Sequence, residues 1–177
     1  TGNVSWTTNG SGSFVTSPCA LSGSDGTATC SVTYTPSSVG SGSHLLTAAY
    51  AGDQDFFSSN GNQAVIVNKA AATVALGSLA QTYDGTPKPA TATTDPADLP
   101  VTFTYNGSAD IPTDAGSYVV VGTVNDGNYQ GSASDTLIID KAVSTTTVTG
   151  GTFTYTGSSH LATVSVTGAG GLSLSPI

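Results

Sequence analysis

Few residues in this 177-residue chain are able to do chemistry, and its two cysteines, Cys19 and Cys30, are the most informative of them. The turn signal at residues 23–26 lies between them. A turn centred on Ser24 and Asp25 would place the cysteines opposite each other on adjacent strands, where a disulfide is feasible. Such a bridge implies an oxidising compartment. The alternatives are two buried thiols or a metal site, but the sequence offers no nearby His pair or further Cys to complete a tetrahedral zinc shell.

Paired carboxylates and histidines are the other candidates for metal binding or catalysis. Asp53 and Asp55 are one residue apart, as at the start of a calcium loop, but the chain contains no Glu to close such a loop. A solvated hairpin turn is therefore favoured for this pair. The two histidines, His44 and His160, fall in different repeats, and no serine nucleophile elbow is present. We predict that the chain is not an enzyme and that it has no catalytic residue, no bound metal and no cofactor.

A structural corner is predicted where Asp114, Gly116 and Tyr118 alternate just before an apolar run. This spacing resembles the tyrosine corner of immunoglobulin-like sandwiches, in which the ring folds back to satisfy a backbone group upstream. Val120 then stands where antibody domains have a cysteine. The same pattern surrounds His44, so we predict that His44 and Tyr118 are equivalent corner residues rather than catalytic or metal-binding groups.

Composition predicts the elements that position these residues. Charged residues make up 8% of the chain, and all 11 acidic residues are Asp. Charged helix formers are thus almost absent, whereas Thr and Val favour strands and Gly, Asp and Asn supply turns. Hydrophobic residues make up 37% and occur in alternating runs that can line a core. The prediction is an all-β fold of tandem immunoglobulin-like β-sandwich modules.

Charge excludes two classes of partner. The net charge is −8, and no cluster of basic residues opposes it, so binding to nucleic acids is disfavoured. No apolar run approaches the roughly 20 residues that a membrane-spanning helix needs. We predict no nucleic-acid partner and no membrane insertion.

The sequence repeats with a period of about 72 residues. Lys69 and Ala70 return as Lys141 and Ala142, which marks the same joint twice. The middle repeat is the most complete, and its strands are expected at residues 72–76, 81–83, 90–94, 101–105, 117–125 and 132–140.

Each repeat resembles a known family. Residues 1–69 resemble the later part of a bacterial immunoglobulin-like domain, with its first strands missing, on Gly2, Val4, Trp6, Cys30, Val32, Tyr34, Pro36, Gly42, His44, Leu46, Ala48, Tyr50, Gly52 and Asp53. Residues 70–142 resemble the MBG family of bacterial surface repeats, on 83–86, 101–105, Gly107, 114–118, 125–129 and 137–142. Residues 143–177 resemble the first half of another MBG-like repeat, with Tyr155, Thr156 and Gly157 at its Tyr-Asp-Gly positions.

The resemblance implies a function outside the cell. Such repeats typically occur in large secreted or cell-surface proteins as stalks, adhesin arms or spacers. The expected function is a non-catalytic structural or adhesive segment that assembles into an extracellular fibre or stalk. The alternative is a carbohydrate-binding accessory module of an extracellular enzyme, with glycans held by Tyr105, Asn106, Asn125, Asp126, Asn128 and Tyr129. Turn chemistry is favoured over glycan binding for those residues.

Incomplete first and third repeats would present open strand edges. Neighbouring sequence in the same polypeptide, or another copy by β-augmentation, is expected to supply the missing strands. The expected partners are therefore neighbouring repeats of the same or another copy.

Overall fold

The computed structural model describes residues 2–24 and 26–174. Its elements there are β-strands and one short 3₁₀ turn, η1 (Ala169–Gly171), which confirms the all-β prediction. The chain divides into two compact units. Unit 1 comprises the chain up to Ala71 together with Asn125–Gln130, and unit 2 comprises Ala72–Val124 and the chain from Gly131 onward. None of the described segments forms a helix that could cross a bilayer.

Unit 1 contains a four-stranded antiparallel sheet of order β3-β1-β7-β8 and smaller two-stranded sheets. Its first strands are β1 (Asn3–Thr8), β2 (Gly12–Val15), β3 (Cys19–Ala20), β4 (Ser22–Ser24) and β5 (Thr27–Thr29). They are followed by β6 (Thr33–Pro36), β7 (Ser43–Tyr50), β8 (Ser59–Ile66) and β9 (Ala70–Ala71). β2 pairs with β6 and β4 with β5, whereas β9 pairs in parallel with β15 (Tyr129–Gln130).

Aromatic rings join the sheets of unit 1. The ring centroids of Trp6 and Phe14 are 6.1 Å apart, and those of Phe14 and Tyr34 are 5.0 Å apart. The Tyr34 ring in turn meets the His44 ring edge-on at 5.9 Å. Trp6 and His44 come from β1 and β7, whereas Phe14 and Tyr34 come from β2 and β6. These distances are in the favourable range for aromatic pairs, so the rings form the core between the two sheets.

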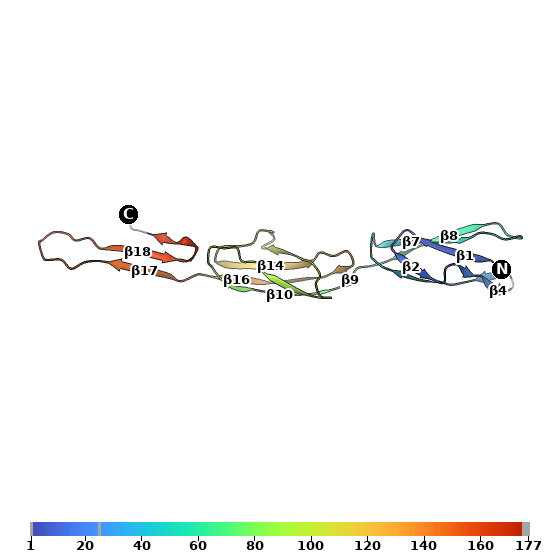
Figure 1. Cartoon of the computed structure of the whole chain (residues 1–177), viewed down its shortest axis with the longest axis horizontal. Coiled ribbons are helices and arrows are strands. Elements are labelled where there is room, and N and C mark those ends of the chain that lie inside the picture. The colour runs from blue at the N-terminus through green and yellow to red at the C-terminus, as the bar shows by residue number, and fades with distance from the viewer. Residues whose placement is uncertain (1, 25, 175–177) are drawn as a thin grey trace. The chain divides into compact units, whose positions relative to one another are not determined.

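Unit 2 contains a two-stranded sheet, β10-β12, and a four-stranded sheet of order β11-β16-β14-β13 (Figure 1). Their bounds are β10 (Thr73–Gly77), β11 (Ala80–Thr82), β12 (Thr91–Asp95), β13 (Val101–Tyr105), β14 (Gly116–Val124) and β16 (Ser132–Asp140). β11 runs parallel to β16 at the edge of the larger sheet, and the other pairs are antiparallel. A further sheet of order β17-β18-β19 follows, made of β17 (Ser144–Thr149), β18 (Thr163–Gly168) and β19 (Ser173–Leu174).

The core of unit 2 is aliphatic. Val120 and Leu137 are both 0% exposed, and Tyr105 and Ile139 are buried beside them. The smaller sheet covers this core closely at Gly122 of β14, because a Cβ there would lie 2.9 Å from Cδ2 of Leu76 in β10. A glycine at this point therefore allows the two sheets to pack face to face.

The β17-β18 hairpin has the register of the β10-β12 hairpin moved along the chain. Thr73 pairs with Asp95, and a shift of 72 residues takes this pair to Thr145 and Thr167, which also pair. The remaining pairs of the two hairpins correspond in the same way. Both strands have thus moved by one sequence period, and the pairing is unchanged.

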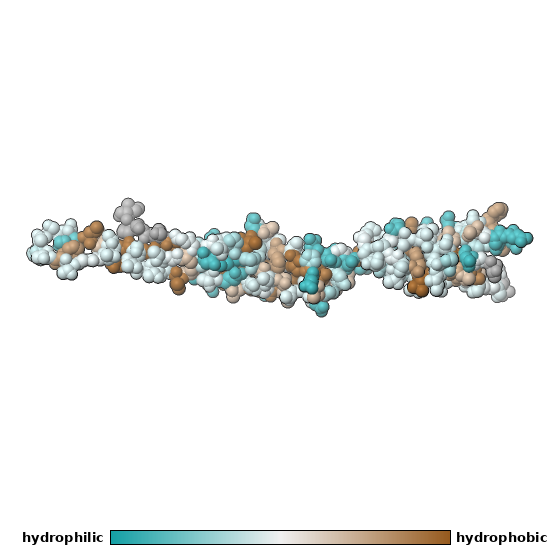
Figure 2. Space-filling model, in the orientation of Figure 1, coloured by the Kyte–Doolittle hydropathy of each residue, from teal (hydrophilic) through white to brown (hydrophobic). Residues whose placement is uncertain are grey.

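The outer surface carries scattered apolar side chains. On the face shown in Figure 2 they form small separate patches among polar residues. Phe57, Tyr155 and Val143 are the most exposed large apolar side chains of the described residues, at 98%, 93% and 90%. Two of these three, Phe57 and Val143, lie in surfaces that are described below.

Candidate functional site

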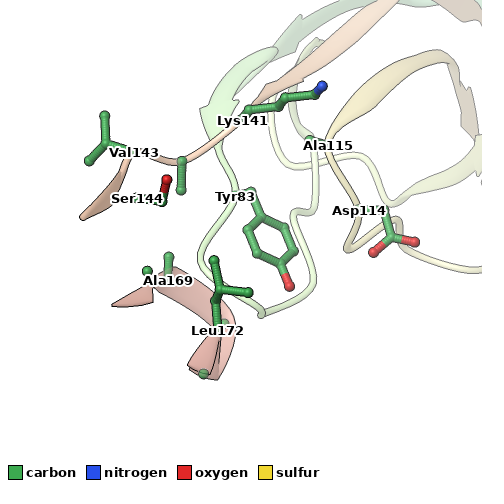
Figure 3. Close-up of a pocket in the computed structure, with 12 residues that line it drawn as sticks. Tyr83, Asp114, Ala115, Lys141, Val143, Ser144, Ala169 and Leu172 are labelled. Carbon is green, nitrogen blue, oxygen red and sulfur yellow. The ribbon is translucent and has the colours of Figure 1, made fainter. Parts of the chain in front are cut away.

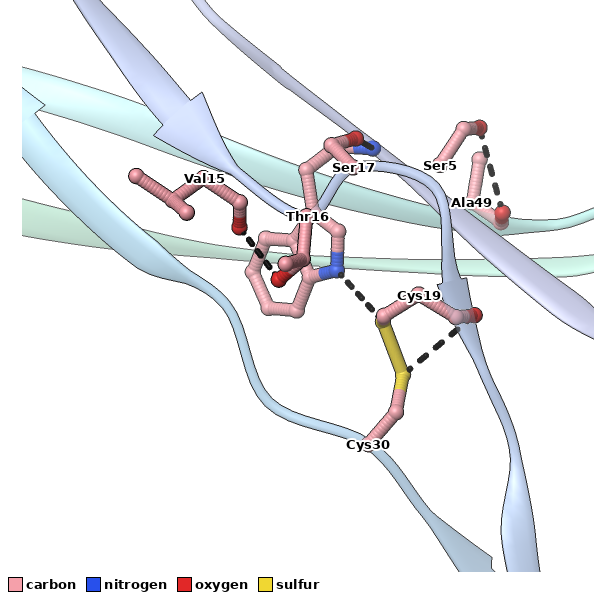
Figure 4. The surroundings of a disulfide bond; sticks show 8 residues. Ser5, Val15, Thr16, Ser17, Cys19, Cys30 and Ala49 are labelled. Carbon is pink, nitrogen blue, oxygen red and sulfur yellow. Dashed lines mark hydrogen bonds between the residues drawn. A yellow bond between two sulfur atoms is a disulfide. The ribbon is translucent and has the colours of Figure 1, made fainter.

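A disulfide joins Cys19 and Cys30, whose Cα atoms are 5.9 Å apart (Figure 4). The indole N–H of Trp6 donates to Sγ of Cys19 at 3.4 Å, so the ring packs against the bridge. Cys19 is buried and Trp6 is half-buried. The cysteines are therefore linked to each other rather than left as thiols, and Trp6 packs in the core as the sequence predicted.

The register predicted around this bridge is wrong. Ser24 pairs with Thr27, so the β4-β5 hairpin turns one residue later than expected. Asp25, half of the predicted turn centre, lies outside the described residues. Cys19 does not face Cys30 across that hairpin but pairs with Val4 in β1, since β3 joins the edge of the four-stranded sheet. The disulfide consequently ties that sheet to the end of the β4-β5 hairpin.

His44 is buried at the start of β7 and has both ring nitrogens hydrogen-bonded. Nε2 lies 3.1 Å from the carbonyl oxygen of Val39, and Nδ1 lies 2.7 Å from the hydroxyl of Tyr34. Because a carbonyl only accepts, Nε2 carries the hydrogen, and Nδ1 of the neutral ring accepts from Tyr34. Neither nitrogen is left for a metal or a substrate.

Tyr118 makes the contact expected of a tyrosine corner. Its hydroxyl donates to the carbonyl oxygen of Asp114 at 2.9 Å. A Cβ on Gly116 would lie 3.4 Å from the Tyr118 ring, so the intervening glycine leaves room for the ring to fold back. Tyr118 and His44 each bond a carbonyl a few residues upstream, and both residues lie at the entry to a long strand.

Replacing Tyr118 with Phe is expected to lower the free energy of unfolding of unit 2 by about 1 kcal/mol. The reason is the loss of one hydroxyl–carbonyl hydrogen bond while the ring itself remains. Urea denaturation of the two proteins measures the difference. Tyr155→Phe is the matched control, because this ring is 93% exposed and its change should have no effect. Equal stabilities for all three proteins would contradict a stabilising corner.

Two aspartates organise turns by accepting hydrogen bonds from the backbone amides two and three residues later. For Asp53 both distances to Oδ1 are 2.9 Å. For Asp126 they are 2.7 Å and 3.0 Å. This is Asx-turn chemistry, and it agrees with the solvated turn that the sequence favoured over a calcium loop at Asp53.

Carboxylates in the turns also have lowered pKa values. The hydrogen bond from the Tyr50 hydroxyl, followed by those from backbone amides, lowers the pKa of Asp53 and raises the pKa of Tyr50. Hydrogen bonds from Lys88 and Thr86 hold the pKa of Asp84 well below its usual range. A carboxyl whose pKa falls on folding adds stability above its unfolded pKa of about 4, and this stability is lost as the pH drops further. These turns are expected to hold at neutral pH and to loosen in acid.

The turn Asn125–Gln130 is held within unit 1 at a site that we call the turn seat, formed by Val39, Lys69 and Ala70. The backbone amides of Val39 and Ala70 donate to Oδ1 and the carbonyl oxygen of Asn128, each at 2.8 Å. Nζ of Lys69 donates to the carbonyl oxygen of Asp126 at 2.6 Å. The turn then continues as β15 beside β9. A space of 240 Å³ remains around the seated turn.

Unit 2 contains a larger space of 580 Å³, which we call the unit 2 hollow (Figure 3). Its wall includes Tyr83, Lys141, Val143 and the loop that carries η1. In Figure 3 the Tyr83 ring lies between Val143 and the carboxylate of Asp114. Lys141 makes no hydrogen bond or ion pair with another residue of the described chain. The hollow therefore offers an aromatic ring, a free ammonium group and exposed backbone.

No metal centre is apparent in residues 2–24 and 26–174, since they contain no cluster of three or more His, Cys, Asp or Glu that could hold an ion. The residues predicted for glycan binding are occupied by structural contacts. Tyr105 is 4% exposed and its hydroxyl accepts the amide hydrogen of Ala90 at 2.9 Å, so its ring cannot stack on a sugar. Oδ1 of Asn106 accepts the amide hydrogen of Val119. Asn128 belongs to the turn seat contacts.

Sequence reasoning missed the turn seat and the unit 2 hollow. Their only signal in the sequence is the recurrence of Lys69 and Ala70 as Lys141 and Ala142, which indicated a joint but not what binds there. Tyr34 was also missed as the partner of His44, because nothing in the spacing of the two residues indicates that their side chains meet.

Comparison with family models matches residues 72–143 to the MBG domain. Comparisons with curated proteins and with solved structures gave no match. The matched residues contain both sheets of the unit 2 core, from β10 to β16. The middle of this chain is thus similar to the MBG domain, as the sequence analysis predicted.

Proposed function

We propose that this chain is a non-catalytic structural and adhesive segment, built from immunoglobulin-like repeats, of a large secreted or cell-surface bacterial protein. The observation that carries the proposal is the common register of the β10-β12 and β17-β18 hairpins, 72 residues apart. The similarity of residues 72–143 to the MBG domain supports it. Modules that recur at a fixed spacing suit a protein that holds a binding part at a distance, because each repeat adds the same length.

The disulfide supports a location outside the cytoplasm, since such bridges form and persist in oxidising compartments. The positions of the reactive groups support a role without catalysis. Both nitrogens of His44 are bonded within the protein, and Cys19 and Cys30 are bridged. Asp53 and Asp126 use their carboxylates to fix turns.

Antibodies raised against this chain test the proposal on intact cells of the organism that produces it. We expect labelling before permeabilisation, because an extracellular segment is accessible to the antibody. An antibody against a cytoplasmic protein is the control and should label only permeabilised cells. Labelling of the chain that appears only after permeabilisation would overturn the proposal.

A further inference from the structure

The turn Gly52–Ser58 of unit 1 has the geometry of the seated turn Asn125–Gln130. Asp53 accepts the amides two and three residues later, as Asp126 does. Phe56 follows Asp53 by three residues, as Tyr129 follows Asp126. Tyr129 is half-buried beside β9, whereas Phe56 is 69% exposed and Phe57 is 98% exposed. The first turn is therefore an unseated counterpart of the second.

The turn seat also has a counterpart, and it lies in the wall of the unit 2 hollow. A shift of 72 residues takes Lys69 and Ala70 to Lys141 and Ala142, both of which line the hollow. The shift that takes His44 to Tyr118 takes Val39 to Thr113, which directly precedes the lining residue Asp114. The groups that hold a turn in unit 1 therefore recur around the hollow.

These recurring groups are free. Lys69 and Ala70 donate to the seated turn, but Lys141 and the backbone of Ala142 make no hydrogen bond with another described residue. Val143, which follows them, is 90% exposed. The space at this position is 580 Å³, compared with 240 Å³ around the seated turn.

Charge complements this fit. The chain carries three basic residues against 11 acidic ones, so the free ammonium group of Lys141 is a scarce positive site. The turn Gly52–Ser58 brings two carboxylates, Asp53 and Asp55. Opposite charges on two surfaces favour their encounter and fix their orientation.

We propose that copies of this chain associate head to tail, with the turn Gly52–Ser58 of one copy seated in the unit 2 hollow of the next. By analogy with the turn seat, Lys141 donates to the carbonyl oxygen of Asp53, and the amide of Ala142 donates to that of Asp55. Phe56 and Phe57 then cover Val143. The turn and the hollow are different surfaces, so the contact is heterologous and continues from copy to copy. This inference deepens the proposed function by naming a partner.

Sedimentation equilibrium of the full chain at concentrations up to about 1 mM tests the association. We expect the average mass of the wild type to rise with concentration. Phe56→Ser with Phe57→Ser, the turn variant, should weaken association about 30-fold or more, the usual effect of removing aromatic residues at the centre of an interface. Tyr155→Ser is the matched control, since it removes an equally exposed ring outside both surfaces and should leave association unchanged.

Two hollow variants complete the set. Ala142→Trp fills the space and should abolish association, and Lys141→Ala removes only a free ammonium group and should weaken it. Thermal unfolding identifies any variant that does not fold, and Lys141→Ala retains a test of the hollow if Ala142→Trp fails. Because Lys141 and the Phe pair are exposed and outside the cores, their variants are expected to fold as the wild type does.

Mixing the turn variant with the hollow variant Ala142→Trp gives the sharpest result. Each variant alone should be monomeric, because one of its two surfaces is lost. The mixture should form a 1:1 dimer and nothing larger, since one variant has the only intact hollow and the other the only intact turn.

A wild type that stays monomeric throughout, or an association that neither surface variant weakens, would overturn the head-to-tail contact. So would a mixture without dimers. Surface labelling of intact cells is independent of these outcomes, so failure of the contact is distinguishable from failure of the proposed function.

Discussion

Replacing Leu137 with Ala is expected to lower the free energy of unfolding of unit 2 by about 2–5 kcal/mol. Leu137 is 0% exposed and packs in the core with Val120, so the smaller side chain leaves a cavity that the two sheets cannot fill. Guanidinium denaturation, followed by circular dichroism, measures the loss as a lower midpoint.

Val119→Ala is the control for this change. Val119 precedes Val120 in β14, but its side chain lies on the other face of the sheet and is 50% exposed. Its truncation is expected to cost less than about 1 kcal/mol, because little apolar surface is lost from the core. Similar losses at Val119 and Leu137 would show that the core does not lie between the two sheets.

Replacing Cys19 and Cys30 together with Ser is expected to lower the stability of unit 1 by about 3 kcal/mol. The bridge spans a sequence separation of 11 residues, and its removal restores that freedom to the unfolded chain. It also removes the sulfur against which the Trp6 indole packs. Thermal unfolding with and without a thiol reductant measures the effect.

The same experiment has an internal control. The reductant should destabilise the wild type and leave the Ser variant unchanged, since the variant has no bridge to break. Equal effects of the reductant on both proteins would contradict a stabilising role for the disulfide.

The strands of the middle repeat were largely predictable because alternating apolar residues and prolines mark them. Residues 101–105 and 132–140 were predicted with the bounds of β13 and β16, and 117–125 differs from β14 by one residue at each end. The pairing of strands was not predictable to the same degree. Alternation indicates which face of a strand is buried but not its neighbour, so the parallel pairs β11-β16 and β9-β15 were missed.

The same physical limit explains the outcome at the candidate site. The corner contact of Tyr118 with Asp114 is local, and its spacing alone indicated it. The bridge of Cys19 with Cys30 was expected for the wrong register, because the sequence does not show that β3 pairs with β1. The unit 2 hollow depends on segments that are far apart in sequence, such as Tyr83 and Lys141, and no local pattern reports their approach.

The disulfide has a mechanical consequence for a chain under tension. When force acts on the two ends, the residues between Cys19 and Cys30 are bypassed, because the covalent bridge carries the load. An extended chain spans at most about 3.6 Å per residue, so the 11-residue separation withholds roughly 40 Å of extension from the oxidised protein. Reduction of one bond would therefore lengthen the pulled chain without breaking its backbone.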